Sequence, residues 1–208
     1  MQPEKIFKTL RERIIWLDLP PERILNLSEL AASFGVSRTP VKEALILLQA
    51  EGWLLRNGAQ FMVTPLSLNR IKETTEIRSV LEVQANVWAL NRILPQELEL
   101  LEAIGEKINE SKLPMTLRDM VKLDFRFHQT LYQAAKNSQL AEMLNLQLSR
   151  YLRIWLSMPG EIEPKSFFFE AKEIIRAIAE KDEERLKEAT LAHINKSIDQ
   201  IGGYFNIG

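Results

Sequence analysis

Up to Gly52, apolar residues recur every three or four positions, and polar or glycine-containing breaks divide the chain into three segments. The first segment runs from Pro3 to Leu17 and is followed by two prolines, which end a helix. The second begins after Asn26, a favourable N-cap, and closes at Gly35, a favourable C-cap. The third begins after Ser37, another favourable N-cap. The pattern therefore predicts three short helices, the last two joined by a tight turn.

The third predicted helix carries one apolar stripe, formed by Val41, Ala44, Leu45 and Leu48. Two short helices joined by a glycine-containing turn form a helix-turn-helix. Residues 53–56 and 60–63 are strand-like and flank Asn57-Gly58, a strong hairpin signal. Helix, helix-turn-helix and hairpin is the order of a winged helix. Because no strand pattern follows Thr64-Pro65, we expect residues 1–65 to form a winged helix-turn-helix domain.

Residues 66–208 have a helical period interrupted by short breaks, which is typical of a helical bundle. About six helices are expected, within Ser67–Pro95, Gln96–Ser111, Leu117–Ala135, Leu140–Leu156, Ser166–Glu180 and Glu183–Ile201. One face of the first of these helices carries Ile77, Val80, Leu81, Gln84, Val87 and Trp88. The predicted fold class is mainly α, with an N-terminal winged helix-turn-helix followed by an all-helical bundle over residues 66–208.

Composition narrows the class of protein. The chain of 208 residues contains no cysteine, which excludes disulfides, iron–sulfur clusters and thiolate zinc sites. It has no run of about 20 apolar residues, the length of a membrane span. The first 13 residues carry charges throughout and lack an apolar signal-peptide core, so we expect a cytoplasmic protein without a membrane partner. Residues 1–65 hold eight basic and seven acidic side chains, so composition alone does not indicate a DNA-binding domain.

The arrangement of polar residues at the start of the third helix does indicate DNA binding. The second helix of a helix-turn-helix enters the major groove and contacts bases from its N-terminal end. Arg38 and Lys42 lie four residues apart, opposite the apolar stripe, so both point outward. Arginine can read guanine, while Ser37, Thr39 and the helix N-terminus can hold phosphate. The alternative is that Arg38 and Lys42 only solubilise an exposed face.

Residues 37–45, Ser-Arg-Thr-Pro-Val-Lys-Glu-Ala-Leu, with Glu-Gly-Trp-Leu at 51–54, resemble the recognition-helix motif of GntR-family regulators. The resemblance covers residues 5 to 65 and implies that Arg38 and Lys42 contact DNA. It also implies that the hairpin approaches a groove or phosphates through Arg56, Asn57 and Gly58.

Two positions depart from the family pattern. Ser28 stands where many members have a phosphate-contacting arginine, and Lys42 is more often arginine. Arg56 is the one cation near the end of the hairpin. A lower DNA affinity or an unusual operator is the expected consequence.

The helical half resembles the FCD domain, the sensing domain of the FadR-like GntR subfamily, over residues 68 to 201. The matching residues are Ile77-Arg78, Leu81-Glu82, Asp124, Phe127-His128, Ala177-Ile178, Asp182 and His193. The resemblance implies a homodimeric transcription regulator, expected to be a repressor. It binds a pseudo-palindromic DNA operator, with an affinity that a small-molecule effector modulates.

Three residues are candidates for a metal site. Asp124 and His128 lie four residues apart on one helix face, a spacing that suits shared ligation, and His193 is the other histidine of the chain. In metal-binding members of the family, one aspartate and three histidines hold a divalent ion. The resemblance places Ala171 where one of those histidines is expected. The three remaining residues either hold zinc, nickel or manganese, or are buried polar groups that hydrogen-bond to one another.

Arg78 is the first candidate for binding the effector, expected to be an organic acid, because a guanidinium pairs with carboxylates. Arg150 is a second candidate. The alternative for Arg78 is an ion pair with Glu82, one turn away. An alternative for the effector is an apolar or fatty-acid-like molecule bound without metal.

A metal-dependent helical-bundle enzyme is the alternative class of protein. A di-iron bundle needs glutamate three residues before histidine, but Phe125 and Thr190 occupy those positions. The chain also lacks a nucleophile elbow or phosphate-binding loop. We therefore expect that the protein is not an enzyme.

Overall fold

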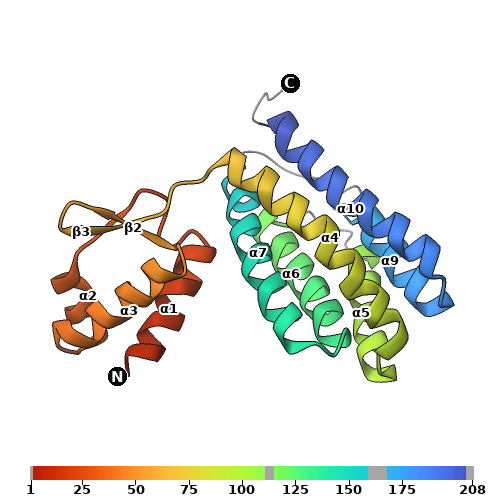
Figure 1. The fold of residues 1–208 in the computed structure, drawn as a ribbon, viewed down its shortest axis with the longest axis horizontal. Coiled ribbons are helices and arrows are strands. Elements are labelled where there is room, and N and C mark those ends of the chain that lie inside the picture. The colour runs from red at the N-terminus through yellow and green to blue at the C-terminus, as the bar shows by residue number, and fades with distance from the viewer. Residues whose placement is uncertain (1, 111–114, 159–167, 205–208) are drawn as a thin grey trace. The chain divides into compact units, whose positions relative to one another are not determined.

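A computed structural model describes residues 2–110, 115–158 and 168–204 (Figure 1). The chain divides into two compact units, Met1–Ser67 and Leu68–Gly208. This division lies two residues beyond the expected boundary at residue 65. The first unit combines three helices with a small sheet, and the described part of the second is helical, so the predicted fold class is confirmed.

The N-terminal unit contains α1 (Pro3–Ile15), α2 (Leu27–Phe34) and α3 (Arg38–Ala50). The predicted stripe of α3 is the centre of its core, since Val41, Ala44, Leu45 and Leu48 are fully buried. α3 packs against both α1 and α2. With its apolar side fixed in this way, α3 must turn its other side to solvent.

A side-chain cap marks the beginning of α2, whereas α3 begins without one. The Asn26 side chain accepts hydrogen bonds from the backbone N–H groups of Ser28 and Glu29, at 2.9 and 3.2 Å. α2 ends at Gly35, whose φ of 63° is the left-handed conformation that glycine adopts without strain. Ser37 occupies the N-cap position of α3, but among the described residues its side chain makes no capping hydrogen bond. Ser37 is therefore the N-cap residue of α3, as predicted, and it is exposed.

The wing is a three-stranded antiparallel sheet with the order β1-β3-β2, formed by β1 (Ile24–Leu25), β2 (Leu54–Asn57) and β3 (Gln60–Val63). Sequence reasoning missed β1, because two residues are too short to show a period. Asn57 pairs with Gln60, so the hairpin loop is Gly58-Ala59 rather than Asn57-Gly58. Gly58 takes a φ of 60°, the positive value that the primed hairpin turns require.

Six helices are described in the second unit: α4 (Leu68–Arg92), α5 (Pro95–Glu110), α6 (Leu117–Ala134), α7 (Ser138–Ser157), α9 (Phe169–Glu180) and α10 (Glu183–Tyr204). α4 packs against α6, α7, α9 and α10, which places it centrally in the bundle. The predicted helix ends at Ser111 and Ser166 lie outside the described residues. Across the described ranges, no helix is both long and apolar enough to cross a lipid bilayer.

The face of α4 that carries the periodic apolar residues is not its buried face. Ile77 is 44 % exposed and Val80 is 71 % exposed, while Leu81, Val87 and Trp88 are half-buried. The buried face instead mixes polar and apolar residues: Ile71, Thr74, Thr75, Arg78, Glu82, Ala85, Asn86, Ala89 and Leu90. A period argument assigns the apolar side to the core, and here the inward side carries charged residues that pair with one another. The apolar stripe of α4 is left facing outward.

Candidate functional site

The outward side of α3 borders a recess in the N-terminal unit. Arg38, Thr39 and Lys42 are exposed and line this recess together with the first turn of α2 and the wing. Its volume is about 760 Å³. We name it the α3 recess. It gathers side chains from three elements that the winged-helix topology brings to one surface.

Four of the predicted DNA-binding residues line the α3 recess: Arg38, Thr39, Lys42 and Arg56. The other three, Ser37, Asn57 and Gly58, are exposed but do not line it. Sequence reasoning missed Gln60 and Ile46, which also line the recess. Gln60 could have been inferred from the hairpin register, whereas Ile46 was obscured because an aliphatic residue normally indicates core.

Arg56 is held against the wing. Its guanidinium lies 4.0 Å from the centre of the Phe61 ring and donates a hydrogen bond to the backbone oxygen of Ala59 at 3.2 Å. Arg56 and Phe61 are directly opposite each other on β2 and β3. The cross-strand pair thus fixes the one cation of the hairpin along the recess wall.

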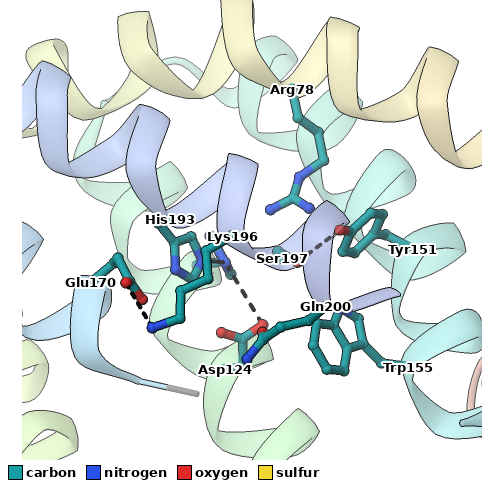
Figure 2. A pocket seen from close by; sticks show the side chains of 10 residues that line it. Arg78, Asp124, Tyr151, Trp155, Glu170, His193, Lys196, Ser197 and Gln200 are labelled. Atoms are coloured by element: carbon teal, nitrogen blue, oxygen red, sulfur yellow. Dashed lines mark hydrogen bonds and ion pairs between the residues drawn. The ribbon is translucent and has the colours of Figure 1, made fainter. Parts of the chain in front are cut away.

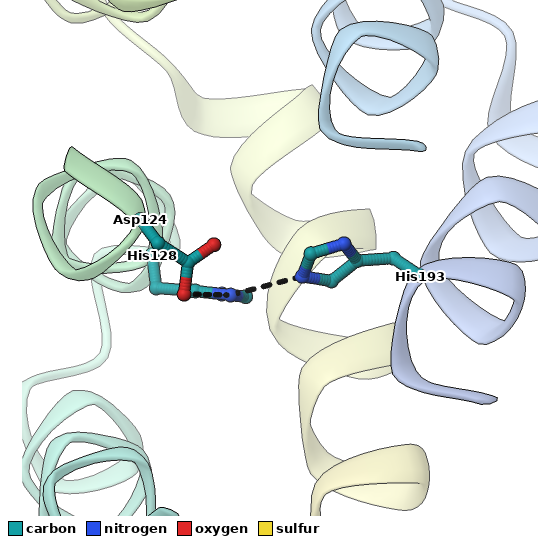
Figure 3. A group of neighbouring side chains, drawn as sticks. All are labelled: Asp124, His128 and His193. Atoms are coloured by element: carbon teal, nitrogen blue, oxygen red, sulfur yellow. Dashed lines mark hydrogen bonds and ion pairs between the residues drawn. The ribbon is translucent and has the colours of Figure 1, made fainter. Parts of the chain in front are cut away.

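Asp124, His128 and His193 form a buried cluster in the helical unit (Figure 3). The first two come from α6, whose apolar residues Leu123, Phe127, Leu131 and Ala134 are buried. His193 reaches them from α10. The Nε2 atoms of the two histidines lie 3.1 Å apart, and Oδ2 of Asp124 lies 3.7 Å from Nε2 of His128.

Burial sets the protonation of this cluster. It raises the pKa of Asp124 to about 7, an effect that Arg78 opposes. Burial lowers the pKa of His193 to about 3, and His128 and Arg78 act in the same direction. The pKa of His128 is also well below its ordinary value, because of burial and then Arg78. Both imidazoles are therefore neutral at pH 7, the form that binds metal ions.

A network of buried charged and polar side chains lies near Nδ1 of His128. Arg78 and Glu82 form a buried ion pair on α4, with Nε 2.6 Å from Oε1, as the alternative for Arg78 predicted. Tyr132 donates a hydrogen bond to Glu82, and its oxygen lies 3.4 Å from Nδ1 of His128. Burial by itself lowers the pKa of Arg78, but Glu82, Tyr132 and Tyr151 raise it above the ordinary value. Arg78 therefore stays charged inside the bundle.

The cluster opens into a small pocket lined by residues from five helices (Figure 2). Arg78 reaches toward it from α4, and its guanidinium lies 4.5 Å from the centre of the Tyr151 ring. Lys196 pairs with Glu170 at 2.9 Å on another side. The cavity volume is about 10 Å³, close to the space of one water molecule.

Arg150, the second candidate for binding the effector, does not line this pocket. On α7 the pocket is lined by Tyr151 and Trp155, which lie one turn apart. Arg150 is rotated about 100° from Tyr151 around the helix axis, so it faces elsewhere. The cation that sequence reasoning missed is Lys196, one turn after His193. Its spacing from that histidine was the available signal.

Ala171, where the family resemblance expects a histidine, is fully buried on α9. Its neighbour Glu170 lines the pocket. A methyl group at position 171 supplies no ligand atom. The described cluster therefore offers one carboxylate and two imidazoles.

Two protein-family models match the chain. Residues 2–60 match the bacterial regulatory proteins of the gntR family, and residues 73–196 match the FCD domain. The solved structure of E. coli McbR/YncC is similar over 98 % of both chains, with a TM-score of 0.85 and 22 % identity. That likeness supports the fold of both units.

Named relatives agree with the family models. The HTH-type transcriptional regulator YdhC of Bacillus subtilis is 31 % identical over 188 residues, covering 88 % of this chain and 82 % of YdhC. The Nta operon transcriptional regulator of Aminobacter aminovorans is 32 % identical over 185 residues, which cover 88 % of this chain and 85 % of that regulator. These relatives are transcription regulators and not enzymes. The chain therefore belongs to the GntR family of DNA-binding transcription regulators, with an FCD domain as its helical unit.

Proposed function

We propose that the protein is a homodimeric repressor that binds a pseudo-palindromic operator and responds to a small organic acid. The observation that carries the DNA half of this proposal is the α3 recess, where Arg38, Thr39 and Lys42 face outward together. Arg38 suits bidentate reading of guanine, and Lys42 suits a phosphate or a second base. Ser37 at the exposed helix start, and Arg56, Asn57 and Gly58 on the hairpin, contact the DNA backbone in this proposal.

The outward stripe of α4 supports the homodimer. Val80 and Ile77 are exposed, and Leu81, Val87 and Trp88 continue the stripe along the helix. A second copy of the same chain is the occupant we propose, because a two-fold contact lets one apolar stripe cover its own equivalent. Few cations line the α3 recess, so stable operator binding requires two winged helices acting together.

The residues of the buried cluster fit a divalent ion. Oδ1 of Asp124 is buried without a hydrogen-bond partner among the described residues. The 3.1 Å between the histidine Nε2 atoms is less than twice a zinc–nitrogen bond of about 2.1 Å, so both can bind one ion. Zinc, nickel or manganese held by Asp124, His128 and His193 would supply positive charge for a carboxylate. Tyr132 and Glu82 lie near Nδ1 of His128, where polar groups can orient an imidazole that binds a metal ion through Nε2.

The pocket's own charges explain why an added cation matters for an acidic effector. Arg78 is paired with Glu82, and Lys196 is paired with Glu170, so neither offers an unopposed positive charge. Lys196 is the more exposed of these two cations, with 34 % of its side chain accessible. In this proposal it exchanges Glu170 for the effector carboxylate, while Arg78 keeps the pocket wall in place.

The small volume of the pocket implies that effector binding changes the conformation of the helical unit. A space of about 10 Å³ does not hold an organic acid, so effector binding must displace side chains or helices around it. An effector that binds only an opened arrangement shifts the protein toward that arrangement. Linkage then requires that DNA and effector alter each other's affinity by the same factor.

The DNA half is tested by measuring the salt dependence of binding to selected duplexes. Lys42→Ala should reduce the steepness of the salt dependence by about one counterion per subunit, and Arg38→Ala should cost about 1–3 kcal/mol of specific binding. Lys107→Ala is the matched control, because Lys107 is an exposed lysine of the helical unit. If Lys107→Ala and Lys42→Ala change the salt slope equally, the α3 recess is not the DNA surface.

A metal-free apolar effector is the second candidate. The observation in its favour is a cavity of about 440 Å³ between the start of α4 and the end of α10, lined in part by Leu68, Ile71, Ile198 and Ile201. A fatty acid that raises the unfolding midpoint equally with and without chelator would favour this cavity. A carboxylate that stabilises only metal-loaded protein would favour the histidine cluster.

A further inference from the structure

Ile46 is an exposed aliphatic residue on the side of α3 that we propose contacts DNA. It is 46 % exposed and lines the α3 recess. It follows Lys42 by four residues and Arg38 by eight, so the three lie along one face of the helix. Among the α3 residues that line the recess, Ile46 has the side chain made of hydrocarbon alone.

The core of the N-terminal unit does not account for Ile46. The opposite side of α3 is already closed by Leu45 and Leu48, which are fully buried. The next residue, Leu47, is equally exposed at 49 % but does not line the recess. Leu47 is therefore a matched comparison, an aliphatic side chain on the same helix turn that faces a different direction.

The neighbours of Ile46 favour contact with bases over contact with phosphates. Glu43 lies on the same face and lines the recess, and its carboxylate repels phosphate. Ile46 has no hydrogen-bond donor for phosphate. This half of the α3 recess therefore suits the edges of base pairs. In the major groove, the one apolar group that a base edge presents is the C5-methyl group of thymine.

We infer that Ile46 selects a thymine in each operator half-site by contacting its methyl group. This inference rests on the proposed function. The helical rise places Ile46 about 6 Å beyond Lys42, a distance of roughly two base steps. The selected thymine should then lie about two base pairs from the base or phosphate that Lys42 contacts.

Uracil substitution tests this inference, because uracil differs from thymine by the methyl group alone. A high-affinity duplex is first selected from a random pool with the full-length protein at fixed salt. Each thymine is then replaced by uracil, and dissociation constants are measured for wild type, Ile46→Ala and Leu47→Ala. We expect one position, equivalent in the two half-sites, at which uracil weakens wild-type binding. The loss should be about fourfold for each half-site, the effect of losing one buried methyl group. Leu47→Ala should show the same fourfold loss, and Ile46→Ala should show none.

Four other outcomes would overturn the inference. Uracil could be neutral for the wild type at every position, or its effect could persist in Ile46→Ala. Equal weakening of all duplexes by Ile46→Ala, with no uracil effect, would place Ile46 against the sugar–phosphate backbone. If no duplex is selected at all, the proposed DNA-binding function fails, and this inference fails with it.

Discussion

His128 on α6 and His193 on α10 are 65 residues apart in the sequence, yet their Nε2 atoms lie 3.1 Å apart inside the helical unit. Both rings are buried and uncharged at neutral pH. Without a further partner, one ring can donate its Nε2 hydrogen to the other. With Asp124 beside them, the same three side chains can instead share one cation.

Divalent metal should stabilise the chelator-treated protein if this cluster is a metal site. Zinc, nickel or manganese at about 100 times its dissociation constant should add about 2.7 kcal/mol to the free energy of unfolding. Thermal unfolding with and without each metal provides the measurement. The stabilisation should vanish in His193→Ala. An equal metal-dependent shift in that variant would mean that the ion binds elsewhere.

In the metal-free protein, Asp124 and His193 should contribute to the free energy of unfolding with opposite dependence on pH. Since the folded-state pKa of His193 is about 3, below its ordinary 6.5, its contribution is full above pH 6.5 and is lost as the pH falls. Asp124, with a folded pKa of about 7 against an ordinary 3.8, contributes most below pH 4 and loses that contribution as the pH rises to 7.

Asp124→Asn should therefore steepen the loss of stability on acidification. The difference in unfolding free energy between pH 7 and pH 5 should grow by on the order of 2 kcal/mol relative to wild type. Urea unfolding at both pH values measures it, and comparison with wild type cancels the contributions of other groups. An unchanged difference between the two pH values would show that Asp124 titrates alike in the folded and unfolded states.

Glu82→Gln should destabilise the helical unit strongly. Arg78 and Glu82 are 2 % and 1 % exposed, so removing the carboxylate leaves a buried guanidinium without its counter-charge. The expected cost is about 3–5 kcal/mol in urea unfolding. Glu170→Gln is the control, because its partner Lys196 is one-third exposed, and the cost there should not exceed about 1 kcal/mol. Equal costs for both variants would contradict the role assigned to burial.

Val80→Asp should separate the proposed dimer into monomers. Val80 is 71 % exposed on the outward stripe of α4, so aspartate is tolerated in a free subunit but would be buried in a two-fold contact. Sedimentation should report a halved mass, and operator affinity should fall with it. Met143→Asp, at a 55 % exposed position on α7, is the matched control and should leave the mass unchanged. The proposal that α4 carries the interface fails if Val80→Asp stays dimeric.

Sequence reasoning predicted most of the local structure because the signals were local. The stripe through Val41 and Leu48 gave the orientation of α3, and the Asn26 cap and Gly35 gave the ends of α2. The outward placement of Arg38 and Lys42 followed from the same period. The exceptions were also local: a two-residue strand has no period, and the hairpin loop shifted by one residue.

The helical unit shows where period reasoning fails. On α4 the apolar side faces outward, while Arg78 and Glu82 face inward, because a charged pair with complementary partners can replace apolar packing. No local signal distinguishes that arrangement from an ordinary amphipathic helix. The position of Arg150 outside the pocket has a related cause, since the side of α7 that faces the pocket depends on how α4 and α6 pack against α7.

By itself, then, the sequence determined the two-unit order, the helix-turn-helix, the outward side of α3 and the identity of Asp124, His128 and His193 as candidate ligands. Those features depend on spacings of a few residues, and the helical period determines from such spacings which side chains share a face. Only the tertiary structure brought His193 to His128, placed Tyr132 beside His128, closed the pocket to about 10 Å³ and added Lys196 and Glu170 to its lining. The distances between helices far apart in sequence are fixed by the packing of whole helix faces, which no short stretch of sequence encodes.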